Sequence, residues 1–325
     1  MTPPLPPSPE TPAAPRHRGG FASRATFGFL LGATFAGLVW ADDVAFAAGM
    51  PAGCCLLPVA LLAAVLGAHE AGAIAATHGR REQFTTAMLG AATIVVAGFF
   101  GLRGQAWASA FDPVPIAVCI AIALPFAVEI VGYRAGGGAL ERAAAGSLAA
   151  VCVGLPIAFM LGLRRLWCDE SWAEQRGPHH VCTLLPLVSF MIVVKAGDIV
   201  AYLVGSSIGR NRLAPVLSPG KTWEGALAGL AGSLAAAWLV LDVVRPAWFP
   251  DRGLTSPWGG WPAYGLLLGL AGIVGDLCES LVKRERGVKD SGRWLGGLGG
   301  VLDLVDSLLL AAPVAWLLWV VARSP

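Results

Sequence analysis

Nine long apolar runs dominate the sequence and restrict what the chain can fold into. They lie near residues 25–40, 53–68, 85–102, 113–131, 143–163, 181–205, 225–244, 260–277 and 302–321. A helix needs about 20 mostly apolar residues to cross the hydrocarbon core of a bilayer. The runs also lack the alternation of apolar and polar residues that is typical of a membrane β-barrel. We therefore expect an all-α integral membrane protein, a polytopic bundle of about nine transmembrane helices.

The N-terminal tail, the net charge and the cysteines give further information on the class of protein. Residues 1–22 are rich in proline and poor in apolar side chains, which predicts a disordered tail. The basic residues before the first run imitate a cleavable signal peptide, but the many later spans favour a retained first helix. A net charge of +2 gives no argument for nucleic acid as a partner. The seven cysteines show no metal-ligand spacing, and we interpret them as small packing residues.

The distribution of Lys and Arg among the loops predicts the orientation. With the N-terminus in the cytoplasm, fifteen of these residues fall on the inside and seven on the outside. Cytoplasmic loops of membrane proteins carry the excess of positive charge. This orientation places the two most polar loops, 206–223 and 278–301, together on the cytoplasmic side. We expect the protein in a bacterial inner (plasma) membrane, with its active site facing the cytoplasm.

Lysine is rare in the chain and is concentrated near these two loops. The sequence has 19 Arg but four Lys, and three of the four, Lys221, Lys283 and Lys289, lie in the polar loops. The lysine ammonium is a compact point charge that suits a phosphate oxygen. The pattern favours phosphate binding, and chance clustering is the alternative.

Acidic residues flank the second polar loop. Asp276 ends the eighth run, and Asp303 and Asp306 open the ninth at a spacing that puts them on one helix face. Carboxylates at a helix start are also favoured by the helix dipole, so simple capping is the alternative. Mg²⁺ is typically held by one or two carboxylates together with substrate phosphates. We predict that Asp276, Asp303 and Asp306 converge on a metal at the membrane surface.

One further acid lies inside an apolar run. Asp198 follows Lys195 by three residues in the sixth span. An ionisable residue at membrane depth is expensive and usually functional. The alternative is an internal pair in which Lys195 and Asp198 neutralise each other.

The first polar loop predicts an anion site. Ser218-Pro219-Gly220 has the composition of a turn, Lys221-Thr222 follows, and a helix is expected to start near Trp223. Backbone N–H groups at a helix start, next to a Lys and a hydroxyl, bind anions. The Gly-Lys-Thr triplet is not a Walker A loop, because that motif needs glycine where Pro215 stands.

These segments together form a long spaced pattern. It contains "AGDIVAY" at 196–202, "SPGKTWEG" at 218–225 and "GDLCES" at 275–280. It continues with the residues Ser280, Lys283, Arg284, Lys289, Asp290, Gly292, Gly299, Gly300, Asp303 and Asp306. The pattern resembles the signature region of the phosphatidate cytidylyltransferase (CDP-diacylglycerol synthase) family over residues 196–310. Two positions depart from it, Leu298 where His is usual and Leu304 where Arg is usual, and each lacks a polar group that could contact phosphate.

The resemblance implies a reaction between CTP and phosphatidic acid that gives CDP-diacylglycerol and pyrophosphate. It implies Mg²⁺, with K⁺ as a candidate second cation, and a homodimer as a candidate assembly. The implied division is a tail (1–22), N-terminal transmembrane helices (23–190) and a catalytic transmembrane region (191–325). The catalytic set is Asp276, Lys283, Lys289, Asp290, Asp303 and Asp306. The substrate-binding set is Asp198, Ser218, Lys221, Thr222, Arg284, Gly299 and Gly300.

Two other functions stay open at this point. A lipid-alcohol kinase using CTP would transfer the γ-phosphoryl group and would need a base, yet neither polar loop contains His. An ion-coupled transporter would use Lys195 and Asp198 at mid-depth, but no internal repeat of the kind transporters often show is evident.

Overall fold

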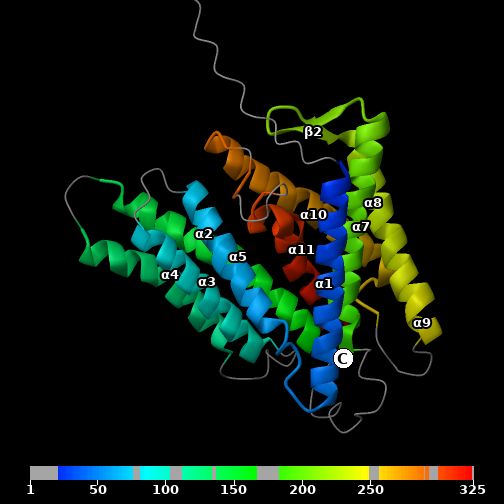
Figure 1. Ribbon diagram of the computed structural model, residues 1–325, viewed down its shortest axis with the longest axis horizontal. Coiled ribbons are helices and arrows are strands. Elements are labelled where there is room, and N and C mark those ends of the chain that lie inside the picture. The colour runs from blue at the N-terminus through cyan, green and yellow to red at the C-terminus, as the bar shows by residue number, and fades with distance from the viewer. Residues whose placement is uncertain are drawn as a thin grey trace, which may run out of the picture.

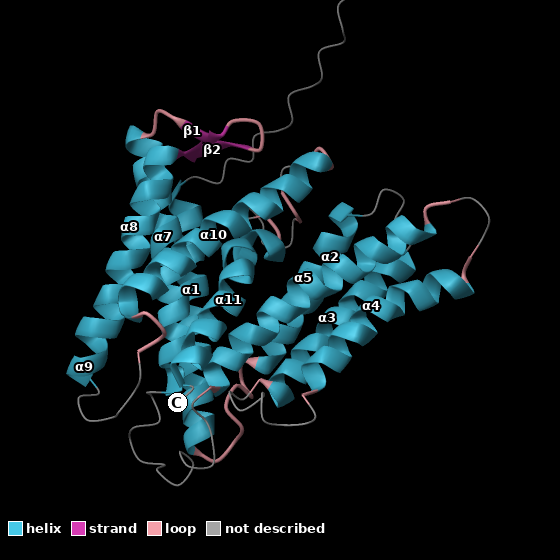
Figure 2. Cartoon of the chain, turned by 180° about the vertical axis from the view of Figure 1, so that it is seen from behind, coloured by secondary structure: helices cyan, strands magenta, loops and turns pink. Residues whose placement is uncertain are grey.

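The computed structural model describes residues 21–75, 81–102, 112–133, 137–166, 183–248, 256–288, 290–292 and 299–323. The described part is almost entirely helical, with one short β-hairpin (Figures 1 and 2). The tail predicted for residues 1–22 lies almost wholly outside the described residues. Lys289 and Leu298 also lie outside them.

Nine helices in the described residues are long and apolar enough to cross a membrane, which confirms the predicted fold class. The first five helices are α1 (Phe21–Ala47), α2 (Leu57–Ala75), α3 (Arg81–Gly101), α4 (Pro113–Val131) and α5 (Ala139–Arg165). The later elements are α7 (Leu185–Ile208), β1 (Arg212–Ala214), β2 (Ser218–Thr222), α8 (Trp223–Trp238), η2 (Leu239–Val244), α9 (Arg245–Trp248), α10 (Gly260–Glu285) and α11 (Val301–Arg323). The π-helical turn η2 joins α8 to α9, so a single span runs from Trp223 to Ala247.

The helices pack in two groups. Helices α2, α3, α4 and α5 form one group, and α7, α8, α10 and α11 form the other (Figure 1). Small residues allow close approach within each group: a Cβ on Gly154 would lie 2.8 Å from the Cα of Ala91, and a Cβ on Gly229 would lie 2.9 Å from the Cβ of Ala201. Small interface residues are how membrane helices gain van der Waals contact. Helix α11 also packs against α5 and α2, so the division at residues 190/191 stays a prediction.

The first polar loop forms a two-stranded hairpin. Strands β1 and β2 pair antiparallel, with Arg212 opposite Thr222 and Ala214 opposite Ser218. The prediction of a turn at Ser218-Pro219-Gly220 is therefore wrong, because these residues lie in β2 and the turn is at 215–217. Pro219 is tolerated there because both strands of a two-stranded sheet are edge strands. Helix α8 begins at Trp223 as predicted, capped by the Thr222 hydroxyl, which accepts from the Gly225 N–H at 3.1 Å.

The hairpin, the end of α10 and the start of α11 lie at the same end of the bundle (Figures 1 and 2). The start of α1 lies at that end as well. Both predicted polar loops therefore meet at one end of the protein, where a single site can use side chains from each.

Candidate active site

A cavity of about 520 Å³ lies between the hairpin and helices α7, α8, α10 and α11. This volume is in the range of small-molecule sites, roughly 300–1,000 Å³. Seven of the predicted site residues line it: Asp198, Ser218, Lys221, Thr222, Asp276, Asp303 and Asp306. The cavity thus brings together residues that are up to 108 positions apart in the sequence.

Three carboxylates converge at this cavity. One oxygen from each of Asp276, Glu279 and Asp306 lies within 4.8 Å of the others. Asp276 and Glu279 share a face of α10 at a spacing of three residues, and Asp306 comes from α11. Glu279 is 8% exposed, and its Oε1 has no hydrogen-bond partner among the described residues. A buried carboxylate oxygen without a partner is costly, and a bound cation would satisfy it. We name these three residues the carboxylate cluster; its chemistry fits Mg²⁺.

Lysines adjoin the carboxylate cluster on two sides. Lys221 Nζ lies 2.7 Å from Asp276 Oδ2, which places the hairpin over α10. Lys283 Nζ donates to Glu279 Oε2 and to Asp303 Oδ1, both at 2.7 Å. These ammonium groups are therefore held beside the acids by ion pairs.

Asp303 lines the same cavity, and its carboxylate is held by contacts within the protein. Its Oδ2 accepts from the backbone N–H groups of Ser291 at 2.9 Å and Gly300 at 2.7 Å. With Lys283 on Oδ1, both of its oxygens are engaged, and Glu279 takes the third place in the carboxylate cluster. Gly299, at φ +91°, provides the left-handed backbone that precedes this contact. The metal role predicted for Asp303 stays a prediction.

Lys195 and Asp198 form the internal pair that the sequence allowed, with Nζ 3.2 Å from Oδ2. The Ser307 hydroxyl donates to the same Asp198 oxygen at 2.8 Å, and Lys195 also donates to the Leu304 carbonyl at 3.3 Å. Both charged side chains are partly exposed to the cavity. The pair therefore links α7 to α11 and also contributes to the cavity wall.

Three other predicted site residues, Arg284, Gly300 and Asp290, are not among the residues that line the cavity. Arg284 Nε donates to the Leu217 carbonyl at 3.2 Å, so it fastens α10 to the hairpin turn. Gly300 lies against Asp303 and Glu70. Asp290 is exposed.

The described residues at this site carry an excess of negative charge. Five carboxylates (Asp198, Asp276, Glu279, Asp303 and Asp306) face three lysines (Lys195, Lys221 and Lys283) in connected ion pairs and contacts. Their formal charge is therefore −2, which one divalent cation would balance. Charges at membrane depth need such compensation.

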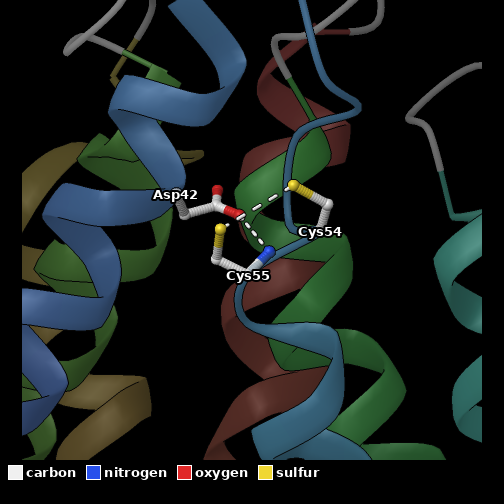
Figure 3. Close-up of side chains that lie close together, drawn as sticks. All are labelled: Asp42, Cys54 and Cys55. Carbon is white, nitrogen blue, oxygen red and sulfur yellow. Dashed lines mark hydrogen bonds between the residues drawn. The ribbon is translucent and has the colours of Figure 1, made fainter. Parts of the chain in front are cut away.

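A second group of metal-ligand atoms lies at the opposite end of the bundle. Asp42, Cys54 and Cys55 approach one another there, with the two sulfur atoms 3.9 Å apart (Figure 3). Asp42 is already satisfied, since Oδ2 accepts from Arg164 Nε at 2.8 Å and from the Gly53 N–H, and Oδ1 accepts from the Cys55 N–H. Burial raises the pKa of the Cys54 thiol, and the adjacent Cys55 raises it further. We call this group the Asp42 cluster and interpret it as a structural anchor of the α1–α2 connection.

Sequence reasoning missed two acids at the site. Glu279 follows Asp276 by three residues, and this spacing of one helical turn is the signal that could have identified it. Glu70 of α2 accepts hydrogen bonds from the start of α11. No local pattern connects Glu70 with a segment 231 residues later.

Comparison with known proteins shows the family of the chain. The model of the cytidylyltransferase family matches residues 22–322. A phosphatidate cytidylyltransferase of Brucella abortus biovar 1 (strain 9-941) is 43% identical over 141 residues, which cover 43% of this chain and 48% of that protein. Proteins of the same name match from Haemophilus influenzae, at 38% identity over 157 residues (48% of this chain, 51% of that protein), and from Synechocystis sp., at 39% over 166 residues (50% and 51%). The chain spans about half the length of these relatives. Because the family model covers nearly the whole chain, the protein belongs to the cytidylyltransferase family.

Proposed function

We propose that the protein transfers CMP from CTP to phosphatidic acid, giving CDP-diacylglycerol and pyrophosphate. The observation that carries the proposal is a cavity lined by Asp276, Asp306 and Lys221, with the unpartnered oxygen of Glu279 close to the two aspartates, at one end of a membrane bundle. Carboxylates that can hold Mg²⁺ and ammonium groups that can hold phosphates are both needed for nucleotidyl transfer. The named relatives support the choice of substrates.

The chemistry requires positioning more than proton transfer. An oxygen of the lipid phosphate attacks the α-phosphorus of CTP, and the bond from that phosphorus to the β-phosphate oxygen breaks in line, releasing pyrophosphate. The attacking oxygen is anionic at neutral pH, so no dedicated base is needed. What the protein must supply is alignment of two polyanions and stabilisation of their charge.

Residues in and beside the cavity would each contribute to this alignment and charge stabilisation. Asp276, Glu279 and Asp306 would hold Mg²⁺, and we keep Asp303 and a second cation such as K⁺ as predictions for the same site. Bound there, Mg²⁺ supplies Lewis-acid polarisation of phosphate oxygens. Lys221, beside Asp276, is placed to hold the triphosphate, and Lys283 to hold the departing pyrophosphate. Ser218 and Thr222 line the cavity next to Lys221, with Asp198 on the opposite helix.

We place this end of the bundle on the cytoplasmic side of a bacterial inner membrane, where CTP is available. The count of Lys and Arg supports that orientation. Arg164 and Arg165, two of the seven residues counted outside, are buried in the bundle, and Arg164 is paired with Asp42. Because these two residues are not in exposed loops, fewer loop Lys and Arg remain on the proposed outer side, and the excess on the cytoplasmic side is larger. A homodimer remains a prediction from the family resemblance.

A labelling experiment tests the proposed reaction against both alternatives. Purified protein in detergent receives phosphatidic acid, MgCl₂ and CTP labelled at the α- or the γ-phosphate, and the lipid is extracted. We expect α-label in the lipid, dependent on phosphatidic acid and Mg²⁺. Label from the γ-phosphate in a lipid alcohol would indicate the kinase instead. Folded protein that transfers neither label would contradict both enzymatic functions and favour the transporter.

A further inference from the structure

The loop between α10 and α11 is anchored at both ends on helices of the other group. At its first end, Arg286 donates to the Ala75 carbonyl at the end of α2 and lies 3.9 Å from Glu141 of α5. At its second end, Glu70 of α2 accepts from the N–H groups of Val301, at 3.1 Å, and Leu302, at 2.8 Å. The first turn of a helix leaves its N–H groups without partners inside the helix. A carboxylate from a distant helix fills that role here.

Glu70 is connected to the carboxylate cluster by a short chain of polar contacts. Its Oε2 accepts from the Ser291 hydroxyl at 3.1 Å, and the same hydroxyl lies 2.8 Å from Asp303 Oδ2. Asp303 in turn holds Lys283, which holds Glu279. Any movement of Glu70 therefore changes the position of the residues that surround the cavity.

The backbone around Glu70 is built for close approach. A Cβ placed on Gly292 or on Gly300 would collide with the Glu70 carboxylate. Glu70 is itself 2% exposed, so it has no route to solvent in this arrangement. A buried carboxylate needs partners, and the donors it finds all belong to the segment 291–302.

We propose that Glu70 is a positioning residue, which sets the geometry of the active-site loop from outside the catalytic helices. It fixes the start of α11, and with it Asp303 and Asp306, relative to α10. The inference rests on the proposed function for its kinetic consequence, while the capping contact stands on the geometry alone. Helices α2 and α5 thus act as a frame for the site as well as a membrane anchor.

The test is Glu70→Gln, which keeps the volume of the side chain but replaces one acceptor oxygen by a donor that opposes the helix N–H groups. The matched control is Glu129→Gln, another buried glutamate, which is paired with Arg142 between α4 and α5. Hydrogen exchange of the peptide containing residues 299–306 is followed by mass spectrometry, and kinetics are measured on the same preparations. The exchange measurement does not depend on activity.

We expect the Val301 and Leu302 amides of Glu70→Gln to exchange about tenfold faster, since hydrogen bonds to a charged group are among the stronger ones. We expect kcat to fall about tenfold and the Mg²⁺ concentration for half-maximal rate to rise, with the KM for CTP changed about twofold or less. Glu129→Gln should move none of these. Ser291→Ala, which removes the hydroxyl between Glu70 and Asp303, should reproduce the kinetic effect in part.

Four results distinguish failure of the inference from failure of the proposed function. Unchanged exchange and unchanged kcat in Glu70→Gln would overturn the inference. An equal loss in Glu70→Gln and Glu129→Gln would assign both residues to general stability and would also overturn it. If Glu70→Gln does not fold, unaltered kinetics and Mg²⁺ dependence in Ser291→Ala decide against the inference. Wild-type protein without nucleotidyl transfer would contradict the proposed function, and the exchange result would still decide the role of Glu70.

Discussion

The two ends of the bundle each gather three potential metal ligands, but they balance charge in opposite ways. At one end, Asp42 and Asp43 lie against Arg164, and the adjacent Arg165 donates to the Ala52 carbonyl, so the formal charges of these four residues cancel. At the other, five carboxylates face three lysines, and an oxygen of Glu279 has no partner among the described residues. Proximity of ligand atoms is common to both ends. Uncompensated formal charge beside a cavity distinguishes the end at which we propose a metal ion.

The largest effect is expected from removing a charge from the carboxylate cluster. Asp276→Asn and Asp306→Asn should each reduce transfer of α-label to lipid by about a hundredfold or more, because a metal ligand contributes several kcal/mol to the barrier. Both variants should remain in the membrane and elute normally in size-exclusion chromatography. Near-normal turnover in either variant would remove that residue from the metal site.

A smaller effect is expected from the hairpin lysine. Lys221→Ala removes the ammonium group 2.7 Å from Asp276 and should lower kcat/KM for CTP by about 10- to 100-fold, as expected for a lost charge-assisted contact to phosphate. Steady-state kinetics with varied CTP measure this. Arg212→Ala, an exposed cation of the same hairpin, is the control. If both variants behave like wild type, the hairpin has a structural role only.

At the opposite end, the expected effect is on stability. Arg164→Met leaves Asp42, whose side chain is fully buried, without its cation. Breaking a buried pair in this way costs about 3–5 kcal/mol. Unfolding in detergent, followed by heat or denaturant, should show the loss, while the kcat of the folded fraction stays near that of wild type. A fall in kcat without a loss of stability would be inconsistent with a purely structural Asp42 cluster.

The smallest effect is expected from the two thiols of the Asp42 cluster. The double variant Cys54→Ser and Cys55→Ser keeps the contacts of Asp42 to the Gly53 and Cys55 backbone N–H groups. Activity should therefore change about twofold or less, as for substitutions that remove no buried pair. Assays with and without a chelator of soft metals check this. If a chelator greatly lowers the activity of wild type and added Zn²⁺ restores it, a metal would be assigned to these thiols.

The sequence was sufficient for the fold class, and seven of the site residues it predicted line one cavity, although their roles stay predictions. The spans follow from apolar run length alone, and Asp276, Asp303 and Asp306 are close because they flank one loop at the ends of two helices. The hairpin was missed because Ser218-Pro219-Gly220 has the composition of a turn, whereas strand pairing places the turn at 215–217.

Two aspects of the site depend on tertiary structure and could not be predicted locally. Lys283 contacts both Asp303 and Glu279, so what separates the two acids is the pair of backbone N–H groups of Ser291 and Gly300, which engage Asp303 alone. The role of Glu70 depends on the packing of α2 against α11. A single glutamate in an apolar helix indicates only that it must have a partner.

Mn²⁺ binding most directly tests whether an ion binds at the carboxylate cluster and not at the Asp42 cluster. Paramagnetic resonance reports the free Mn²⁺ that remains after titration into purified protein with CTP, for wild type, Asp306→Asn and the double Cys54→Ser, Cys55→Ser variant. We expect wild type and the double cysteine variant to bind Mn²⁺ alike, and we expect Asp306→Asn to lose this binding. Equal binding by Asp306→Asn and wild type, or loss in the cysteine variant, would contradict the assignment of the ion to the carboxylate cluster.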